Sequence, residues 1–396
     1  MKNRIQGYIK RARFEYLMWN WRRQSRRNTR RIQQWQQSFQ ASSAEVVLGA
    51  HLALAGGVRN HLLAIKRFSR LNVELVPTEE QLQKWGIQPF YASAQHVQQF
   101  VETPPPPTAF AVHTHVFPQL INWAKLHAPG KLRWVHTHHL YYYPEHGETG
   151  LEPWQQRLNE AMIDGARNAD VCLSVNRWEQ EMLLRDYGIR AHFVPNGVDV
   201  EKADSSKPDR FLKNNRITAP FALWVGRLDP VKNPLAFVKL ALEHPELSCV
   251  MIGGISKDDI RREYNTEPPA NLKLLPALSH EQTLDAIAAC KTLVVTSHRE
   301  GLPTLVMEGM ALRRSIVIPQ ERGCMDATDG ATCARIYAPE KSGDLNEKVL
   351  SAMADSTSNA AGRERAVEVL DWRVITRTLD EIYKGKVPDS SPTATL

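Results

Sequence analysis

The sequence predicts an α/β protein with two doubly wound domains, each built on a parallel sheet, and a basic helical extension at the N-terminus. From about residue 44, short apolar runs alternate with amphipathic runs whose apolar residues have helical spacing. The alternation pauses over residues 201–216, which are polar with no clear period, and then restarts. Strands that alternate with helices form parallel sheets through right-handed crossovers, and 396 residues suffice for two such blocks.

The composition excludes several classes of protein. With 42% hydrophobic and 23% charged residues, the chain is an ordinary globular one. The most apolar stretch, Val46–Val58, is too short and too rich in glycine to span a bilayer. The five cysteines form no Cys-x-x-Cys pair, which argues against a disulfide framework and a zinc site of that kind. Residues 1–30 lack the apolar core of a secretory signal, so we expect a cytoplasmic protein.

The first block is assigned to a domain of residues 41–200. Its apolar runs predict strands at residues 46–54, 109–113, 132–137, 171–175 and 191–194. Helical spacing predicts helices at residues 59–69, 153–167 and 178–187.

The second block is assigned to a domain of residues 201–365. Strands are predicted at residues 221–225, 249–252, 272–275, 293–296 and 316–319. Helices are predicted at residues 235–242, 280–289, 303–312, 345–353 and 372–383. Residues 366–385 form a separate C-terminal helical segment, and residues 386–396, rich in Pro, Ser and Thr, are expected to be a disordered tail.

Residues 1–40 carry the basic charge of the chain. They hold eleven Lys and Arg residues against Glu15 alone, a net charge of +10, whereas the other residues sum to −3. Seven aromatic residues lie in the same segment: Tyr8, Phe14, Tyr16, Trp19, Trp21, Trp35 and Phe39. A basic amphipathic helix with such aromatics favours contact with an anionic membrane surface, here the inner face of the membrane. The alternatives are a helix packed on the body, a disordered arm, or an arm that binds nucleic acid. No other segment has the pattern of a nucleic-acid-binding motif, so we do not expect nucleic acid as a partner.

Several common motifs are absent. The chain has no Gly-x4-Gly-Lys-Ser/Thr loop, no Gly-x-Gly-x-x-Gly and no Gly-x-Ser-x-Gly. These absences argue against a P-loop ATPase, a typical dinucleotide dehydrogenase and an α/β-hydrolase. No Asp-x-Asp is present to hold a metal-bound diphosphate, so we expect neither a metal nor a cofactor.

The strongest signal is the stretch Arg299–Glu308, which follows a predicted strand and opens a helix. Pro303 suits the first helical position, which leaves the amides of Thr304 and Leu305 free to bind phosphate. Glu308 lies about 7–8 Å further along the helix axis, the distance from a diphosphate to a ribose. Glu300 lies in the preceding loop, beside the same pocket. The alternative is an ordinary helix start with Glu308 on a solvated face.

A second signal places two cations after the strand 221–225. Arg227 and Lys232 lie in the loop at its carboxyl end, where open α/β sheets bind ligands. They are suited to neutralising a leaving diphosphate without a metal, although a turn with two exposed cations has the same pattern. Gly56 and Gly57 follow the first strand, where glycine lets the backbone approach a ligand, but such pairs are common in tight turns.

The last signal is a concentration of histidines in the first block: eleven of the 14 precede residue 200. Five of them fall at or just beyond the ends of two predicted strands: His113, His115, His136, His138 and His139. A zinc site is possible on number alone. However, alternate residues of a strand point to opposite faces, so all five cannot share one ion. We expect a histidine that lines a cleft and hydrogen-bonds a polar substrate.

Together these segments resemble the family 4 glycosyltransferases, the retaining enzymes of the two-Rossmann (GT-B) fold, of the kind that builds bacterial lipopolysaccharide and polysaccharide. The Glu300-x7-Glu308 and Gly226-Arg227…Lys232 motifs are similar to the family's donor-site pair. Val194–Asp199 resembles its interdomain stretch, and Gly56-Gly57 its first loop. Val135-His-Thr-His-His139 is similar to the family's Thr-x-His strand end.

The resemblance implies two Rossmann-like domains facing across a cleft, with the acceptor on the first and a nucleotide sugar on the second. It implies that Arg227 and Lys232 bind the diphosphate and that the amides of Thr304 and Leu305 cap a phosphate. Glu308 would bind the ribose, Gly57 would close over the diphosphate, and His139 and Glu300 would be catalytic, near the transferred sugar. The last helix would cross back onto the first domain.

Two departures affect this comparison. Arg313 stands where a glycine usually follows the helix of the Glu-x7-Glu motif. The loop Arg322–Asp326 lacks the family's Gly-Gly-x-x-Glu form, so the family's donor-sugar contacts are not carried over to that loop.

The resemblance therefore implies a retaining, metal-independent hexosyltransferase. Its donor would be a nucleoside-diphosphate sugar, with UDP or GDP expected, and its acceptor a glycolipid, lipopolysaccharide or polysaccharide at the membrane. The alternatives are a sugar-nucleotide epimerase and a non-catalytic sugar- or partner-binding protein of the same fold.

Overall fold

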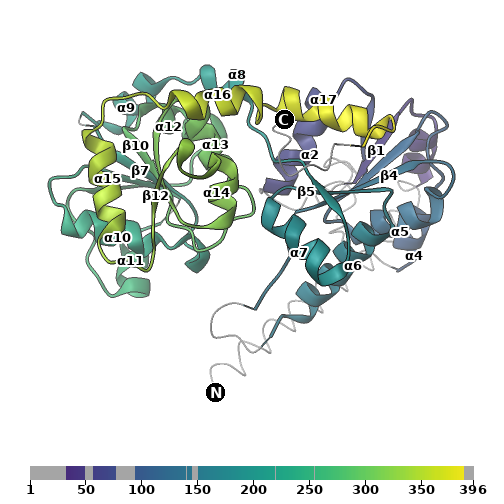
Figure 1. Ribbon diagram of the computed structural model, residues 1–396, viewed down its shortest axis with the longest axis horizontal. Helices are drawn as coiled ribbons and strands as arrows, with labels where there is room; N and C mark the ends of the chain where they lie inside the picture. The colour runs from purple at the N-terminus through teal and green to yellow at the C-terminus, as the bar shows by residue number, and fades with distance from the viewer. Residues whose placement is uncertain are drawn as a thin grey trace. The chain divides into compact units, whose positions relative to one another are not determined.

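The computed structural model describes residues 33–49, 57–76, 94–139, 141–144, 150–218, 220–253 and 255–387, with the backbone alone for residues 94–97 and 264. The chain forms two compact units (Figure 1). Unit 1 comprises residues 1–174, 179–192 and 376–392, and unit 2 comprises residues 175–178, 193–375 and 393–396. Most of the predicted extension, Gly56 and most of the predicted tail lie outside the described residues. Within those residues, every helix is too short or too polar to cross a membrane.

Unit 1 is built around a six-stranded sheet with the strand order β2-β1-β3-β4-β5-β6. The strands are β1 (Val46–Gly49), β2 (Val73–Val76), β3 (Ala111–Thr114), β4 (Arg133–His138), β5 (Val171–Ser174) and β6 (Ala191–Phe193). The pairings from β2 through β5 are parallel, and β1, β3 and β5 are buried along their whole length. Burial on both faces explains why these strands appear in the sequence as continuous apolar runs.

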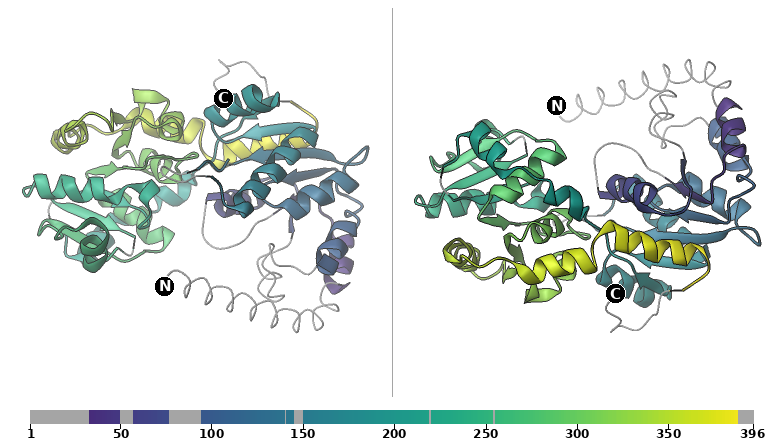
Figure 2. Two further views of the ribbon diagram at one scale, coloured as in Figure 1. Left: turned by 90° about the horizontal axis from the view of Figure 1, so that it is seen from below. Right: turned by 90° about the horizontal axis from the view of Figure 1, so that it is seen from above.

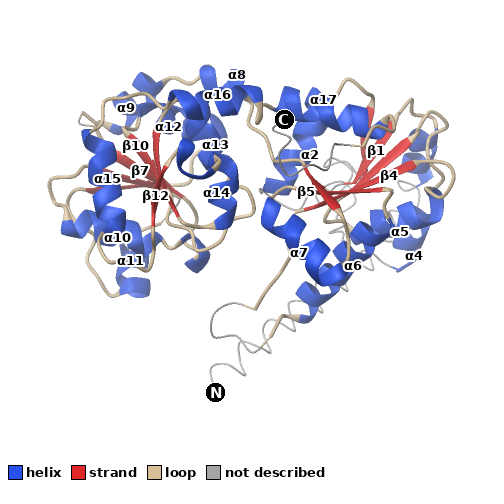
Figure 3. Cartoon of the chain, viewed as in Figure 1, coloured by secondary structure: helices blue, strands red, loops and turns tan. Residues whose placement is uncertain are grey.

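Helices cover both faces of this sheet (Figure 3). They are α2 (Gly57–Phe68), α4 (Ala94–Glu102), α5 (Pro118–His127), α6 (Pro153–Asn168), α7 (Arg177–Tyr187) and the larger part of α17 (Trp372–Tyr383). Helix α17 contacts the end of α2, where the Thr376 hydroxyl donates to the Phe68 carbonyl at 3.2 Å. The Asp380 carboxylate accepts the Ser69 hydroxyl at 2.5 Å and the Arg70 amide at 2.9 Å. The second half of this last helix is thus part of unit 1 (Figure 2).

The aromatic residues nearest the body do not form a membrane-facing surface. Residues 33–40 are helical, and Trp35 and Phe39 are 4% and 2% exposed within the core of unit 1. The Trp35 ring stacks on Phe39 and Phe100, with centroids 5.2 and 5.6 Å apart, and Phe39 meets the edge of Trp123. The prediction that these two aromatics serve a membrane contact was therefore wrong, because burial in the core satisfies them. This end of the segment follows the packed-helix alternative.

Unit 2 contains a second six-stranded sheet, with the order β12-β11-β10-β7-β8-β9 and parallel pairing throughout. Its strands are β7 (Ala222–Val225), β8 (Cys249–Ile252), β9 (Leu272–Leu275), β10 (Thr292–Val294), β11 (Ser315–Pro319) and β12 (Arg335–Tyr337). Its helices are α8 (Val200–Asp204), α9 (Pro208–Asn215), α10 (Pro234–Glu243), α11 (Lys257–Tyr264), α12 (His280–Ala289), α13 (Thr304–Ala311), α14 (Arg322–Thr328), α15 (Asp344–Ala354) and α16 (Ala360–Glu368), with 3-10 turns η1 (Pro230–Lys232) and η2 (Gly330–Thr332). The two sheets confirm the predicted α/β class with two parallel, doubly wound blocks.

Residues 201–216, which are polar with no clear period in the sequence, form most of helices α8 and α9. Helix α8 begins at Val200 and is capped by Asp199, whose carboxylate accepts the Lys202 amide, and α9 follows after a short turn. In α9 the side chain of Phe211 alone is buried, so the helix has no apolar stripe that a sequence pattern could reveal. The buried carboxylate of Asp285 on α12 accepts the Lys207 amide at 2.7 Å and supports the start of α9 from outside.

The histidines of unit 1 divide between the two faces of the sheet, as strand alternation requires. On the face of α17, His113 Nδ1 lies 2.6 Å from the Tyr383 hydroxyl and its Nε2 lies 2.7 Å from Thr137 Oγ1. On the face of α6, His136 Nδ1 lies 2.9 Å from Thr114 Oγ1, and its ring packs against Gly165. Complete burial lowers the pKa of His136 to about 3, so the folded protein keeps this imidazole neutral.

Arg313 follows the end of α13 and has a backbone conformation that glycine adopts more easily than other residues. Its φ is +57°, in the left-handed region, and its amide donates to the Met310 carbonyl at 2.9 Å. The Arg314 amide then donates to the Gly309 carbonyl at 2.9 Å, which closes the last helical turn. The chain therefore keeps, with an arginine, the turn that the family usually forms with glycine.

Replacing that arginine is expected to stabilise the protein. Arg313→Gly relieves the left-handed strain at an exposed side chain and is expected to raise the free energy of unfolding by about 0.5–1 kcal/mol. The matched control, Lys239→Gly in the middle of α10, is expected to lower it by about 1 kcal/mol. Urea unfolding measures both, and a destabilised Arg313→Gly variant contradicts the prediction.

Acid is expected to destabilise unit 1 through His136. An unfolded histidine titrates near pH 6.5, so below that pH His136 binds a proton in the unfolded chain but not in the folded one. The free energy of unfolding therefore falls as the pH drops below 6.5, by about 2 kcal/mol at pH 5 from this residue. In urea unfolding between pH 8 and 5, His136→Gln should show a shallower decline, whatever its stability at pH 7. The control is His244→Gln, whose free energy of unfolding should fall with pH as that of the wild type does. A His136→Gln variant with the same pH dependence as the wild type contradicts the prediction.

Candidate functional site

The candidate residues of unit 2 lie in loops that follow neighbouring strands of its sheet. Strand β7 leads into Gly226 and Arg227 and then into the turn η1, which ends at Lys232. The adjacent strand β10 leads into the loop that carries Glu300 and then into α13. The carboxyl ends of adjacent parallel strands lie at the same edge of a sheet, so the fold brings these two loops together.

Two glycines let the ends of β7 and β8 approach closely. Gly253 has a φ of +153°, and a Cβ atom there would lie 1.6 Å from the carbonyl oxygen of Gly226. The Gly226 amide donates to the Ile252 carbonyl at 3.0 Å. Gly253 was missed in the sequence, where the only available signal was its place directly after an apolar run.

Lys232 and Glu300 form the central ion pair of the site. The Lys232 ammonium lies 2.6 Å from Glu300 Oε1, and the Ser297 hydroxyl donates to the same oxygen at 2.6 Å. The side chains of Lys232 and Glu300 are 28% and 13% exposed, so the pair is only partly screened by water. These two predicted residues, 68 positions apart, are thus brought into direct contact.

The two loops are also joined through their backbones. The His298 amide donates to the Val231 carbonyl at 2.8 Å. The Thr296 hydroxyl lies 2.8 Å from the Lys232 carbonyl and 2.9 Å from the Asn233 carbonyl, and it accepts the Trp224 indole N–H at 2.9 Å. Lys232 is therefore held by its main chain as well as by its charge.

Arg227 is placed differently from Lys232. Its guanidinium lies 3.5 Å from the Asp229 carboxylate, and its side chain is 80% exposed. An exposed arginine on a site loop keeps most of its N–H groups available to an anion. The structure puts Arg227 on the same loop as Lys232 but not in the ion pair with Glu300.

The start of α13 differs by one residue from the prediction. The helix begins at Thr304, and Pro303 precedes it with an extended ψ of 112°. The Pro303 carbonyl accepts the Val306 amide at 3.1 Å, as a capping residue does. The prediction that Pro303 is the first helical residue was wrong, because that place belongs to Thr304. The amides of Thr304 and Leu305 are the first two of the helix and have no acceptor within it.

Glu308 on α13 is held by a chain of two further residues. His280 Nε2 lies 2.6 Å from Glu308 Oε1, and the Lys202 ammonium lies 2.9 Å from His280 Nδ1. Because the ammonium can only donate, His280 accepts at Nδ1 and donates its Nε2–H to the carboxylate. Glu308 is 9% exposed, so the predicted solvated-face alternative does not hold. Lys202 and His280 were missed, since no local pattern connects them with Glu308.

The segment Arg322–Asp326, which departs from the family form, is held in place by contacts around Glu321 and Gly323. Glu321 precedes α14 and accepts the Cys324 amide at 3.0 Å. Burial raises the pKa of the Glu321 carboxyl, while amide hydrogen bonds act in the opposite direction. A Cβ at Gly323 would lie 2.4 Å from the Glu300 carbonyl oxygen, so only glycine allows α14 to pack against the Glu300 loop. Glu321 and Gly323 thus fix the backbone on which Glu300 lies.

His139 in unit 1 follows the end of β4 and is 6% exposed. Its Nε2 lies 2.8 Å from Nδ1 of His115, which follows β3. Burial, followed by the neighbouring histidines His61 and His113, lowers the pKa of His139 well below 6.5. At neutral pH it is a neutral imidazole that can donate or accept one hydrogen bond.

His138 and Gly57 have different surroundings. His138 lies on the opposite face, with Nε2 3.9 Å from the buried Glu179 carboxylate, and burial lowers its pKa to about 4. Gly57 is the first residue of α2, and a Cβ there would meet no atom within 4 Å. Steric room therefore does not require glycine at position 57.

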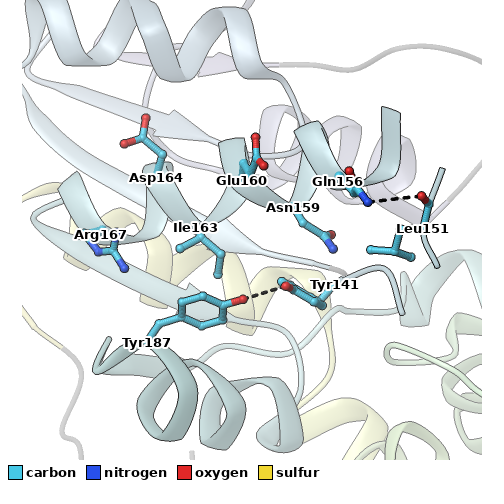
Figure 4. Close-up of a pocket in the computed structure, with 9 residues that line it drawn as sticks. All are labelled: Tyr141, Leu151, Gln156, Asn159, Glu160, Ile163, Asp164, Arg167 and Tyr187. Atoms are coloured by element: carbon cyan, nitrogen blue, oxygen red, sulfur yellow. Dashed lines mark hydrogen bonds between the residues drawn. The ribbon is translucent and has the colours of Figure 1, made fainter. Parts of the chain in front are cut away.

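A pocket of about 420 Å³ opens along α6 in unit 1 (Figure 4). Its lining residues are Tyr141, Leu151, Gln156, Asn159, Glu160, Ile163, Asp164, Arg167 and Tyr187. The hydroxyls of Tyr141 and Tyr187 lie 2.7 Å apart, and burial with this hydrogen bond raises the pKa of Tyr187 to about 12. The mixture of tyrosine, amide and charged groups suits a polar ligand with several hydroxyls.

Two family models match the chain. The model described as Glycosyltransferase Family 4 matches residues 80–202, and the model described as Glycosyl transferases group 1 matches residues 206–368. The two matches adjoin within the sequence, and the second contains every candidate residue of unit 2 except Lys202.

Two curated relatives resemble parts of the chain. The Escherichia coli UDP-Gal:alpha-D-GlcNAc-diphosphoundecaprenol alpha-1,3-galactosyltransferase is 28% identical over 142 residues, which cover 33% of this chain and 36% of that protein. The Campylobacter jejuni N,N'-diacetylbacillosaminyl-diphospho-undecaprenol alpha-1,3-N-acetylgalactosaminyltransferase is 24% identical over 166 residues, which cover 40% and 44%. The chain thus matches less than half the length of both relatives.

Solved structures share the fold over most of the chain. Anabaena HepE in complex with UDP and glucose has a TM-score of 0.69 at 16% identity, over 87% of this chain and all of that one. Sucrose-phosphate synthase from Thermosynechococcus elongatus has a TM-score of 0.68 at 17% identity, over 86% and 98%. The likeness to these structures over most of the chain shows the GT-B fold, and the two family models show that the chain belongs to glycosyltransferase family 4.

Proposed function

We propose that this chain is a retaining, metal-independent glycosyltransferase. It transfers a hexose from a nucleoside-diphosphate sugar, UDP or GDP, to a lipid-linked or polysaccharide acceptor at the cytoplasmic face of the membrane. The observation that supports the proposal is the Lys232–Glu300 ion pair. It joins two loops at one edge of the unit 2 sheet, and α13 begins directly after the second of these loops. It puts a fixed cation and a helix N-terminus where a diphosphate is expected to bind.

In the proposed reaction, the bond between the sugar and the diphosphate breaks and negative charge develops on the leaving phosphate. Lys232 and Arg227 neutralise that charge, together with the amides of Thr304 and Leu305. These groups are fixed before the reaction, so little energy is lost to reorganisation during it. Glu308 accepts hydrogen bonds from the ribose. With this set of cations and amides, the diphosphate has its counter-charge from the protein itself.

The transferred sugar is assigned to Glu300 and His139. Glu300 lies beside the phosphate-binding cation, so it is close to the bond that breaks. His139 is neutral, because burial lowers its pKa, and it therefore hydrogen-bonds a sugar hydroxyl rather than supplying charge. The acceptor is assigned to unit 1, where the pocket along α6 offers groups that hydrogen-bond hydroxyls.

The proposed acceptor class follows from the relatives. Both named bacterial relatives act on sugars linked to a diphospho-undecaprenol lipid. A Corynebacterium glutamicum relative, 19% identical over 256 residues, is named as a mannosyltransferase acting on a phosphatidylinositol mannoside with GDP-mannose. A lipid-linked acceptor requires the enzyme to work at a membrane. The basic residues of the N-terminal segment supply attraction to an anionic surface.

A donor screen followed by a transfer assay tests the proposal. Thermal shift with UDP, GDP, ADP and CMP sugars, with and without EDTA, is expected to show stabilisation by one nucleotide class that EDTA does not change. Radiolabelled sugar should then move to a lipid-linked acceptor with retained configuration. Donor binding without transfer to any acceptor favours a binding protein, and conversion of the donor to its epimer favours an epimerase.

Glu308→Gln is expected to weaken donor use. Loss of a charged hydrogen bond to the ribose costs about 1.5–3 kcal/mol, which is about a 10- to 150-fold fall in kcat/KM. Glu347→Gln, an exposed carboxylate on α15 of the same unit, is the matched control and should leave kcat/KM unchanged. Wild-type kinetics in a folded Glu308→Gln variant contradict the ribose assignment.

His280→Ala is expected to act through Glu308 rather than on the sugar. Loss of the Nε2–H donor frees the carboxylate, so the donor KM should rise about 3- to 10-fold with little change in kcat. A 2′-deoxy donor should lose less affinity in His280→Ala than in the wild type, and His280→Gln, whose amide can donate, should recover part of the effect. Equal losses with both donors would show that His280 does not position Glu308.

A further inference from the structure

Three buried histidines of unit 1 converge from three separate segments. His61 lies on α2, His115 follows β3 and His139 follows β4. One ring nitrogen from each lies within 4.8 Å of the other two, and the ring centroids are 4.7–5.3 Å apart. All three side chains are buried, with exposures of 1%, 0% and 6%.

We propose that His61, His115 and His139 bind a transition-metal ion, with Zn²⁺ as the ion that fits best. Three imidazoles are a donor set that zinc, cobalt, nickel and copper accept, whereas magnesium and calcium require oxygen ligands. This site is separate from the proposed diphosphate site of unit 2. It shares His139 with the proposed sugar contact: with Nε2 on the ion, the Nδ1–H of His139 remains to hydrogen-bond a sugar hydroxyl. Metal binding itself does not depend on the proposed transferase activity.

The positions of the nitrogens suit a tetrahedral ion after small side-chain rotations. Zinc binds imidazole at about 2.0–2.1 Å, which puts its ligand atoms about 3.3 Å apart. His115 Nδ1 and His139 Nε2 are already 2.8 Å apart and share one proton between them. In the bound form the ion lies between these nitrogens, and each ring carries its proton on the other nitrogen, so no net proton is released. The three ligand atoms lie within 4.8 Å of one another, so no pair must close by more than about 1.5 Å.

The surrounding histidines explain why the site has three ligands and not more. Both ring nitrogens of His113 are engaged, with the Tyr383 hydroxyl and with Thr137. His136 packs against α6 on the opposite face of the sheet, and His138 lies near Glu179 on that face. Three protein ligands leave the fourth position of a tetrahedral ion open to water or an anion, as in catalytic zinc sites.

Metal binding to the whole protein tests this site directly. Tag-free, chelator-treated protein is titrated with Zn²⁺ against a chromogenic chelator, and bound zinc is counted by elemental analysis. The wild type is expected to bind one equivalent, and His61→Gln and His115→Gln are expected to bind at least tenfold more weakly. His244→Gln, a histidine in unit 2, is the matched control and should bind like the wild type. Circular dichroism checks that each variant is folded.

Co²⁺ substitution in the wild type provides a second measurement that does not depend on the variants. A tetrahedral site with nitrogen ligands gives intense visible absorption, whereas a loosely bound, octahedral ion gives weak bands. A wild type that binds no more zinc than its two folded variants overturns the proposal. Weak octahedral cobalt bands overturn it as well, even where a variant fails to fold.

Discussion

The ion pair between Lys232 and Glu300 is the interaction on which the arrangement of the candidate site in unit 2 depends. An ammonium and a carboxylate 2.6 Å apart, with side chains mostly shielded from water, attract each other far more than an exposed pair does. Removing one partner would leave the other charged and poorly solvated. The pair therefore joins the loop after β7 to the loop after β10, and the start of α13 follows directly from the second loop.

The same region shows why charge and backbone must be arranged together. Thr296 and Ser297 hold the two halves of the pair, Thr296 through the Lys232 carbonyl and Ser297 through the Glu300 carboxylate. Gly323 allows the start of α14 to lie against the Glu300 carbonyl. If the proposed diphosphate binds here, it would compete with Glu300 for the Lys232 ammonium, and the Glu300 carboxylate would then be free to turn toward the sugar.

Local patterns predicted the strongly periodic elements well, missed others such as strands β2 and β12 and helices α4 and α5, and predicted the long-range contacts poorly. Strands 249–252 and 272–275 and helices 280–289 and 372–383 have the predicted bounds, because strong apolar patterns and caps mark them. Helix α9 has no such pattern, since Phe211 is its one buried side chain. Trp35 and Phe39 have the composition of an interfacial segment, and only the presence of Phe100 and Trp123 opposite them makes them core residues.

The candidate site residues show the same division. Lys232, Glu300 and Glu308 were proposed from motifs, because each lies next to a strand end or helix start that the sequence marks. His280 and Lys202 were not, since the contacts of His280 with Glu308 and of Lys202 with His280 join residues 28 and 78 positions apart and leave no periodic trace. Strand alternation did anticipate that the five histidines near the ends of β3 and β4 could not all share one ion. It could not show that α2 would bring His61 to His115 and His139, because that contact depends on how a helix packs over the sheet.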